Sequence, residues 1–281
     1  MPQTSRTKRT RTARRRFGQH FLEPVWAEKV LAAVAPDPSD IFLEIGPGTG
    51  ALTLRLAERA ARVVAVEIDR DLIARLAPSL PANVSLVSGD VLDMDLVALA
   101  AETAPASEPI RVAGNLPYNI SSPILFRLLD LQSRRRLRDA TLMLQREVAE
   151  RIVAGPGSRD YGVLSILTQF RATVTTLLTL PPGAFRPMPA VSSALIRLTF
   201  HLPRVPVRDV PTFERLVRSV FTQRRKTLGN ALKAFAEDSS LSAAEALSRA
   251  GIDARQRPET LEMVDFAGLA DVFAASDEAV S

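Results

Sequence analysis

Short apolar runs alternate with amphipathic segments along the chain from residue 41 to residue 144. Short apolar runs are typical of buried strands, whereas the segments between them carry the apolar spacing of helices. Because strands and helices alternate, the pattern predicts a parallel sheet whose strands are joined by crossover helices. The predicted strands are 41–45, 63–68, 84–87, 110–114 and 140–144, and the predicted helices include 51–60 and 72–80.

A different pattern follows near residue 173. Apolar runs at 173–180 and 193–200 flank the proline-rich loop 181–190, and they predict an antiparallel pair at the end of the sheet. We expect the loop to overhang the sheet edge. The predicted fold class is therefore α/β, with a seven-stranded, mostly parallel sheet and an antiparallel end pair.

Strand patterns disappear after about residue 205, where apolar residues recur at helical spacing. A capping box joins Ser242 to Glu245, and Gly251 is a helix stop. These signals predict a small C-terminal helical domain over residues 205–281, next to a larger domain over residues 17–204.

Residues 115–118 read Asn-Leu-Pro-Tyr and follow the fourth predicted strand. Ser122 is a candidate N-cap and Pro123 fits a first helical position, so we expect a helix to begin there. The tetrapeptide therefore lies in a loop between a strand and a helix. The alternative is a plain turn with a buried ring.

The positive charge of the chain is concentrated at its start. Seven of the 36 Lys and Arg residues lie in residues 1–16, which contain no acid, so residues 17–281 hold 29 bases against 31 acids. Such a tail cannot fold alone, so we expect it to be disordered, and it suits a polyanion such as ribosomal RNA. An organelle transit peptide and a merely solubilising end are the alternatives.

The chain contains no cysteine and only two histidines, His20 and His201. This excludes disulfides and thiolate zinc sites, and we expect no metal centre. No stretch approaches the ~20 apolar residues of a membrane span, and the N-terminus lacks the apolar core of a secretory signal. We expect a cytoplasmic protein without a membrane partner.

Polar side chains end four of the predicted strands, at intervals of 23, 23 and 25 residues: Glu44, Glu67, Asp90 and Asn115. Because the carboxyl ends of parallel strands share one edge, we expect these side chains to converge on one crevice. The glycine turn 46–50 suits a nucleotide-bearing cofactor, and Glu67 suits a ribose diol. Nicotinamide and S-adenosylmethionine enzymes share both features, so the cofactor stays open at this point.

Six stretches carry a resemblance in their order and spacing: FGQHFL (17–22), EIGPGTGALT (44–53), VVAVEID (63–69), GDVLDMD (89–95), NLPY (115–118) and FRPMPAVSSALIRL (185–198). They resemble the ribosomal RNA adenine N6-dimethyltransferase family. A seventh, FTQRRKTLGNAL (221–232), resembles the branch that acts on the small ribosomal subunit. The resemblance implies a Rossmann-like class I methyltransferase fold over residues 17–204 and RNA binding by the helical domain.

The resemblance also implies S-adenosylmethionine as cofactor. The implied contacts are His20, Leu22, Gly46, Glu67, Asp90 and Asn115. The first three would hold the methionine portion, the next two the ribose and the adenine amine, and the last would face both ligands. The sequence departs from the family at His20, where asparagine is more frequent, and at Ser192 and Ser193, where a Lys/Val-Asp-Ser pattern is common.

By the same resemblance, Asn115, Leu116, Pro117 and Tyr118 act on the substrate adenine. Its amino group is a poor nucleophile because the lone pair is delocalised into the ring. Hydrogen bonds from N6–H to the Asn115 amide oxygen and the Leu116 carbonyl would direct that lone pair at the methyl group, and Pro117 would fix the turn. Tyr118 would stack on one face of the flipped-out base and Phe185 on the other.

Two basic clusters are expected to contact RNA phosphates. The first is expected in a loop at the sheet edge, and the second on the first helix of the helical domain. They comprise Arg134, Arg135, Arg136, Arg224, Arg225 and Lys226.

The function implied is S-adenosylmethionine-dependent dimethylation of two adjacent adenines in the hairpin loop near the 3′ end of small-subunit rRNA. The enzyme would be a monomer that binds the pre-mature subunit during its biogenesis. Two alternatives keep the fold: a large-subunit rRNA methyltransferase of the macrolide-resistance type, and a ribosome-assembly or transcription factor without activity. A nicotinamide dehydrogenase is a third, and it leaves residues 115–118 without a role.

Overall fold

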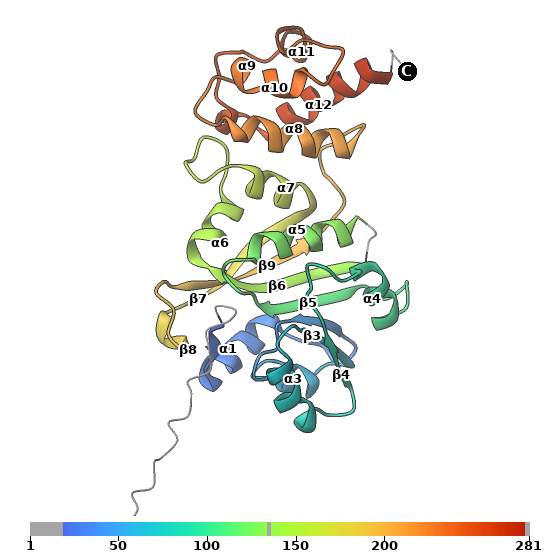
Figure 1. Ribbon diagram of the computed structural model, residues 1–281, viewed down its shortest axis with the longest axis vertical. Helices are drawn as coiled ribbons and strands as arrows, with labels where there is room; N and C mark the ends of the chain where they lie inside the picture. Colours follow the sequence, from blue (N-terminus) through green and yellow to red (C-terminus); the bar gives the residue numbers. More distant parts are fainter. Residues whose placement is uncertain (1–18, 134–135, 279–281) are drawn as a thin grey trace, which may run out of the picture.

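Seven strands form the main sheet of the structure, a computed structural model that describes residues 19–133 and 136–278 (Figure 1). The strand order is β4-β3-β2-β5-β6-β9-β7. The strands are β2 (Ile41–Ile45), β3 (Arg62–Glu67), β4 (Val84–Ser88), β5 (Ile110–Asn115), β6 (Leu137–Gln145), β7 (Ala172–Leu180) and β9 (Ser193–Phe200). The strands from β4 to β6 run parallel, and β9 pairs antiparallel with both β6 and β7. The predicted sheet is confirmed.

The order in which strands are added to the sheet reverses between β2 and β5. From β2 it proceeds outward to β3 and β4, and it then returns to lay β5 on the other side of β2. Ligands of doubly wound sheets bind at such a reversal, outside the carboxyl ends of the strands. The topology therefore places the crevice beside the ends of β2 and β5.

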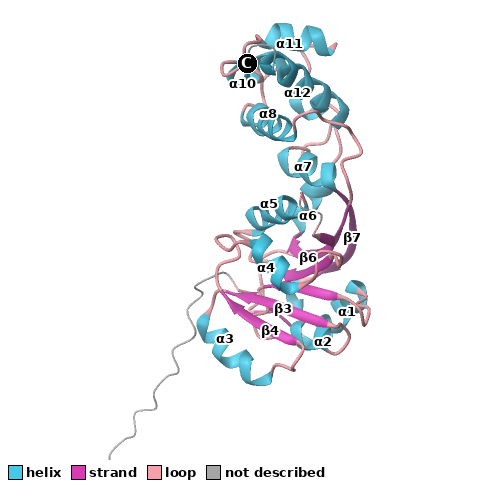
Figure 2. Ribbon diagram, turned by 90° about the vertical axis from the view of Figure 1, so that its right-hand side faces the viewer, coloured by secondary structure: helices cyan, strands magenta, loops and turns pink. Residues whose placement is uncertain are grey.

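Helices lie on both faces of the sheet (Figure 2). They are α1 (Pro24–Val34), α2 (Thr53–Ala57), α3 (Arg70–Leu76), α4 (Leu96–Thr103), α5 (Ser121–Gln132), α6 (Arg146–Val153) and α7 (Val163–Arg171). Leu43 of β2 packs in a cluster with α4 and α5, whereas its neighbour Phe42 packs with α1 and α2. Successive side chains of a strand point to opposite faces, so one uninterrupted apolar run supplies both layers.

Helix α5 begins earlier than predicted. Its first residue is Ser121, so Ser122 is not the N-cap and Pro123 is the third helical residue. The buried Ser121 hydroxyl donates to the carbonyl of Tyr118 at 3.3 Å. Pro123 is tolerated because the first N–H groups of a helix have no partner within the helix.

A buried arginine holds α1 against the sheet. Arg111 of β5 forms ion pairs with Asp40 at 2.6 Å and Asp139 at 3.0 Å, and it donates to the carbonyls of Val34 and Ala35 at the end of α1. A cation is favourable at a helix C-terminus, where carbonyl groups lack partners. The ion pairs and carbonyl contacts together compensate for burying the guanidinium.

The C-terminal part of the chain is helical. It contains α8 (Val210–Thr222), α9 (Leu228–Ala231), α10 (Lys233–Ala236), α11 (Ala243–Ala250) and α12 (Met263–Glu278). The predicted capping box of Ser242 with Glu245 is present, and Gly251 ends α11 with φ +70°. A left-handed φ of this kind favours glycine.

The apolar core of these helices continues into α7. Phe170 of α7 contacts Phe213 of α8 with ring centroids 4.6 Å apart, and Arg171 pairs with Glu214 at 2.5 Å. Leu129 of α5 belongs to the same apolar cluster. The last strand, β9, ends shortly before the predicted boundary near residue 205, and one apolar core continues across that boundary.

Candidate active site

A cavity of about 230 Å³ lies at the carboxyl ends of the parallel strands. Glu67, Asp90 and Asn115 line it, as the spacing of strand ends predicts, together with Gly46 and His20. Glu44 does not line this cavity. It lies 2% exposed beside a second, smaller cavity of about 30 Å³ that also borders Gly46 and Asn115.

The glycine turn follows β2 in a left-handed conformation. Gly46, Gly48 and Gly50 have φ values of +71°, +57° and +81°. A Cβ atom on Gly48 would lie 3.1 Å from the ring of Phe21. The turn needs glycine for its backbone and, at Gly48, also for space.

Three backbone amides hold the carboxylate of Glu67. Its Oε1 accepts from the N–H groups of Ile68 and Asp69, both at 3.0 Å, and its Oε2 accepts from Gly48 at 3.1 Å. These bonds fix an acceptor at the end of β3, where a ribose diol could donate to it. Asp90 accepts from the N–H of Leu92 through Oδ1 at 2.9 Å. Its Oδ2 has no hydrogen-bond partner within the described ranges and is available to an amine.

The Asn-Leu-Pro-Tyr loop forms a corner at the rim of the cavity. The Asn115 amide donates through Nδ2 to the carbonyl of His20 at 2.6 Å. Its Oδ1 has no partner among residues 19–133 and 136–278, so an acceptor is left for a ligand. The N–H of buried Leu116 donates to the carbonyl of Met143 at 3.2 Å, which ties the loop to β6.

Tyr118 is held from two sides. Its hydroxyl shares a hydrogen bond of 2.7 Å with Ser193, and its ring stacks with that of His20 at 5.3 Å between centroids. Partial burial raises the pKa of the Tyr118 phenol above its ordinary value, so the hydroxyl is neutral near pH 7. The Ser193 hydroxyl thus helps to hold the Tyr118 ring in place.

The prediction that Phe185 stacks on the base is wrong for this structure. Phe185 is 0% exposed, because β1 (Phe21–Leu22) pairs with β8 (Phe185–Arg186) and the ring points into the core. Leu22 is its register partner and is also buried. Leu22 borders the smaller cavity and does not line the larger one.

Comparison with known proteins identifies the family. The model of the family described as ribosomal RNA adenine dimethylase matches residues 10–274. The chain belongs to this family. The ribosomal RNA small subunit methyltransferase A of Pseudomonas fluorescens is 46% identical over 267 residues, which are 93% of this chain and 94% of that protein. The protein of the same name from Aeromonas hydrophila is 38% identical over 281 residues, 99% and 100% of the two chains.

Solved structures agree with the assignment of the chain to this family. A dimethyladenosine transferase from Plasmodium falciparum aligns with a TM-score of 0.72 at 26% identity, over 89% of this chain and 96% of that one. The 23S rRNA methyltransferase ErmE aligns with a TM-score of 0.65 at 24% identity, over 90% and 99%, which shows the shared fold. The predicted methyltransferase fold, enzyme class and S-adenosylmethionine cofactor are confirmed, and the comparisons favour none of the alternatives.

The crevice of the adenine dimethylase fits that cofactor. The left-handed turn at Gly46 and Gly48 leaves room that side chains would fill. The buried Oε2 of Glu44 has no hydrogen-bond partner in the described part of the chain. Burial, with a smaller contribution from the charge of Glu67, raises the pKa of Glu44 to about 7. An unpaired carboxyl group beside the glycine turn suits a ligand with a cationic end.

Of the first predicted basic cluster, only Arg136 lies in the described part of the chain. Arg134 and Arg135 lie outside the described residues. Arg136 donates to the carbonyls of Ala100, Ala104 and Pro105 at the end of α4, so its guanidinium caps a helix. The prediction for Arg136 is therefore wrong.

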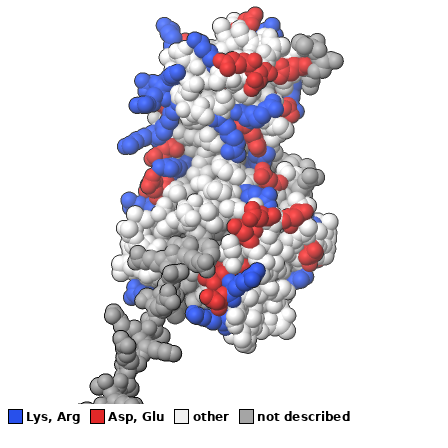
Figure 3. All heavy atoms as spheres, in the orientation of Figure 1, with Lys and Arg blue, Asp and Glu red and all other residues white. Residues whose placement is uncertain are grey.

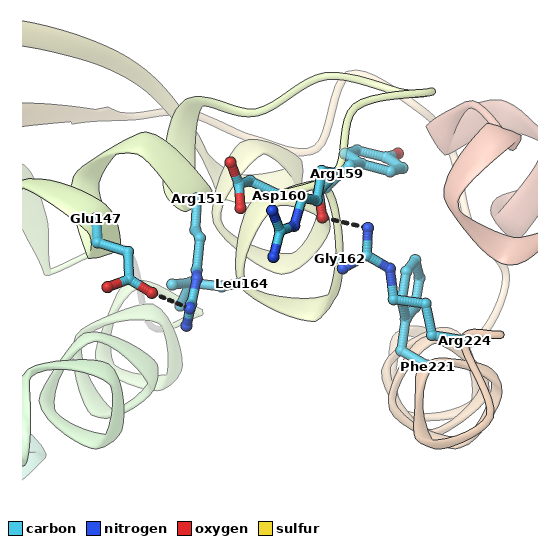
Figure 4. Close-up of a pocket in the computed structure, with 9 residues that line it drawn as sticks. Glu147, Arg151, Arg159, Asp160, Gly162, Leu164, Phe221 and Arg224 are labelled. Atoms are coloured by element: carbon cyan, nitrogen blue, oxygen red, sulfur yellow. Dashed lines mark hydrogen bonds and ion pairs between the residues drawn. The ribbon is translucent and has the colours of Figure 1, made fainter.

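The second basic cluster follows α8 instead of lying on it, because α8 ends at Thr222. Arg224 borders a cavity of about 560 Å³ that Arg151 and Arg159 also line (Figure 4). Figure 4 shows Arg224 donating to the carbonyl of Arg159 across this cavity, and Arg151 paired with Glu147 on α6. Sequence reasoning missed Arg151 and Arg159, because isolated arginines among acids carry no local signal.

No group of three or more His, Cys, Asp or Glu side chains within the described ranges could hold a metal ion. None of the helices built from these residues is long and apolar enough to cross a membrane.

Proposed function

We propose that the protein dimethylates N6 of two adjacent adenines in the 3′-terminal hairpin loop of small-subunit rRNA, acting as a monomer on the pre-mature subunit in the cytoplasm. The observation that carries this proposal is the corner of residues 115–118, which borders the cavity lined by Glu67 and Asp90. The names of the relatives from Pseudomonas fluorescens and Aeromonas hydrophila support the small subunit as the substrate.

In this mechanism Asn115 and Leu116 position the amine. The free Oδ1 of Asn115 and the Leu116 carbonyl accept the two N6–H groups, which withdraws the lone pair from the ring and aims it away from both acceptors. S-adenosylmethionine supplies an electrophilic methyl group. No strong base is required, because the N6 proton becomes acidic only as the new bond forms.

The cofactor would be held by groups that the fold has already fixed. Glu67 offers an oriented carboxylate for ribose hydroxyls, and Asp90 offers Oδ2 for the adenine amine. The Gly46 turn and Glu44 lie where the cationic methionine end belongs. Because the donors to Glu67 are backbone amides, its orientation does not depend on other side chains.

Tyr118 supplies the stacking surface for the substrate base. A base inside a helix cannot reach this corner, so the target adenine has to leave its stack. The Ser193 bond holds the ring in place before the base arrives. Stacking on an aromatic ring stabilises a single-stranded base by about 1–3 kcal/mol.

RNA phosphates would contact the basic side chains that border the helical part. Lys and Arg side chains lie along one edge of this upper part of the molecule in Figure 3. Arg225 and Lys226 are exposed, and the cavity with Arg151, Arg159 and Arg224 lies beside them. Acidic side chains lie among these basic ones and limit the net charge of the surface. We infer that the basic side chains contact phosphates of a folded RNA, which is recognised by its shape.

We expect the double substitution Arg225→Ala with Lys226→Ala to weaken binding to small subunits and to lower the salt dependence. Each lost phosphate contact reduces the slope of log Kobs against log salt by about 0.9, so the slope falls by about 2. Filter binding across a salt series measures it. Arg70→Ala with Arg75→Ala, two exposed arginines of α3, is the matched control and leaves the slope unchanged. An unchanged slope in the first variant would contradict the contacts.

The function itself is tested by the position of the methyl label. The protein is incubated with labelled S-adenosylmethionine and under-methylated small subunits, and primer-extension stops are mapped on both rRNAs. We expect label at two adjacent adenines near the 3′ end of small-subunit rRNA. Label on a large-subunit adenine would overturn the small-subunit proposal, and no label on either rRNA would favour an assembly factor.

A further inference from the structure

His20 makes three contacts at the rim of the crevice. Its imidazole stacks on Tyr118 with centroids 5.3 Å apart and planes 27° apart. Its Nδ1–H donates to the carbonyl of Pro187 at 2.7 Å, and its own carbonyl accepts from Asn115 at 2.6 Å. His20 therefore contacts the Tyr118 ring, the Asn115 amide and Pro187 of the proline-rich loop.

These contacts coincide with the requirements of the substrate base. Under the proposed function, the target adenine has to lie on Tyr118 while its N6 reaches the Oδ1 of Asn115. The His20 ring already stacks on Tyr118, and the backbone carbonyl of His20 accepts from Nδ2 of Asn115, beside the Oδ1 that the base would use. An imidazole is a flat heteroaromatic ring, and it is one of the two fused rings of a purine. Its distance and tilt are those of an offset stack.

Phe185, the residue predicted to stack on the other face of the base, does not lie at this corner. Phe185 is fully buried in this structure, so its ring does not face Tyr118 across the corner. Among the described residues, His20 provides the ring that stacks on Tyr118. The space at the corner is thus occupied by a side chain that resembles part of the substrate.

We infer that His20 is a specificity-determining residue whose imidazole takes the place of the target adenine in the free enzyme. The base enters by displacing this ring from Tyr118. An RNA base that stacks weakly, or that cannot also bond to Asn115, does not displace it. The inference rests on the proposed function, because it assumes that adenine is the base that binds at this corner.

The chain around His20 permits the ring to leave. From Phe21 onward the segment is anchored by the pairing of β1 with β8 and by the ion pair of Glu23 with Arg186 at 3.1 Å. The His20 ring stacks on Tyr118 and donates one hydrogen bond to Pro187. Rotation of one side chain therefore clears Tyr118 without breaking the strand pair.

The test compares three variants in the absence of cofactor. His20→Ala removes the ring, His20→Phe keeps a ring but loses the bond to Pro187, and His20→Asn keeps a donor but loses the ring. The probe is the small-subunit 3′ hairpin that keeps adenine at both target positions and carries 2-aminopurine at the position next to them, where its fluorescence rises when the neighbouring target adenine leaves the stack. Circular dichroism and thermal unfolding verify that each variant is folded.

We expect His20→Ala and His20→Asn to bind the hairpin three- to tenfold more tightly than the natural protein, with higher 2-aminopurine fluorescence. His20→Phe should bind no more tightly than the natural protein, because a ring still covers Tyr118. Equal or weaker binding by His20→Ala would overturn the inference, since the imidazole would then support the base or have no part in binding it.

The natural protein separates this inference from the proposed function. If it fails to bind and methylate the hairpin and the small subunit, the proposed function fails. If it binds and methylates them while His20→Ala binds no more tightly, only the role of His20 fails.

Discussion

We expect Asn115→Ala to lower kcat/KM for methyl transfer by about a thousandfold, or about 4 kcal/mol of transition-state stabilisation. The substitution removes the Oδ1 acceptor that would withdraw the adenine lone pair from the ring. It also removes the Nδ2 bond of 2.6 Å to the carbonyl of His20, so the segment over the crevice loses one anchor. Steady-state methylation of under-methylated small subunits measures the effect.

Two further variants isolate the acceptor role of Asn115. Asn115→Asp keeps an oxygen acceptor but cannot donate to the carbonyl of His20, so it should retain more activity than Asn115→Ala. Asn230→Ala changes an exposed amide of α9, away from the cavity, and should leave kcat within about twofold. If Asn115→Ala keeps more than a tenth of the natural activity, the hydrogen-bonding mechanism at this corner is wrong.

The second large effect concerns Glu44 and the pH dependence of stability. Burial raises the pKa of this carboxyl from 4.5 to about 7. Above pH 4.5 the unfolded chain loses the proton while the folded protein keeps it, so the free energy of unfolding falls as pH rises to about 7. The loss amounts to about 3 kcal/mol at higher pH.

Glu44→Gln preserves the shape of the side chain and is neutral at every pH. We expect the variant to match the natural protein near pH 4.5 and to exceed its stability by about 3 kcal/mol at pH 8, in the absence of cofactor. Urea unfolding between pH 4.5 and pH 8 measures the difference. Glu58→Gln, at an exposed glutamate, is the control. A stability difference that does not change with pH would contradict the raised pKa.

The sequence predicts the centre of the sheet because β2, β3 and β5 are buried on both faces. A continuous apolar run such as 41–45 needs no knowledge of its neighbours to be recognised as a strand, and the polar residue at the end of each run marks the edge that binds ligands. The placement of Glu67, Asp90 and Asn115 on one cavity follows from that regularity. The glycine turn is equally local, because its left-handed backbone requires glycine.

The errors in prediction concern contacts between distant segments. Phe185 is directed into the core by pairing with residues more than 160 positions earlier, which no local pattern reveals. Arg136 resembles a nucleic-acid contact in sequence, but its guanidinium caps α4, about 35 residues away along the chain. The stack of His20 on Tyr118 is likewise a property of the folded chain.

The apolar contact between α7 and α8 has a consequence for substrate choice. Since Phe170 and Phe213 belong to one packed cluster, the catalytic crevice and the basic segment after α8 are fixed to a common body. A packed interior cannot stretch as a linker does. Under the proposed function, an RNA contacts both regions only if its folded shape sets the unpaired adenine and the distant phosphates at the matching separation.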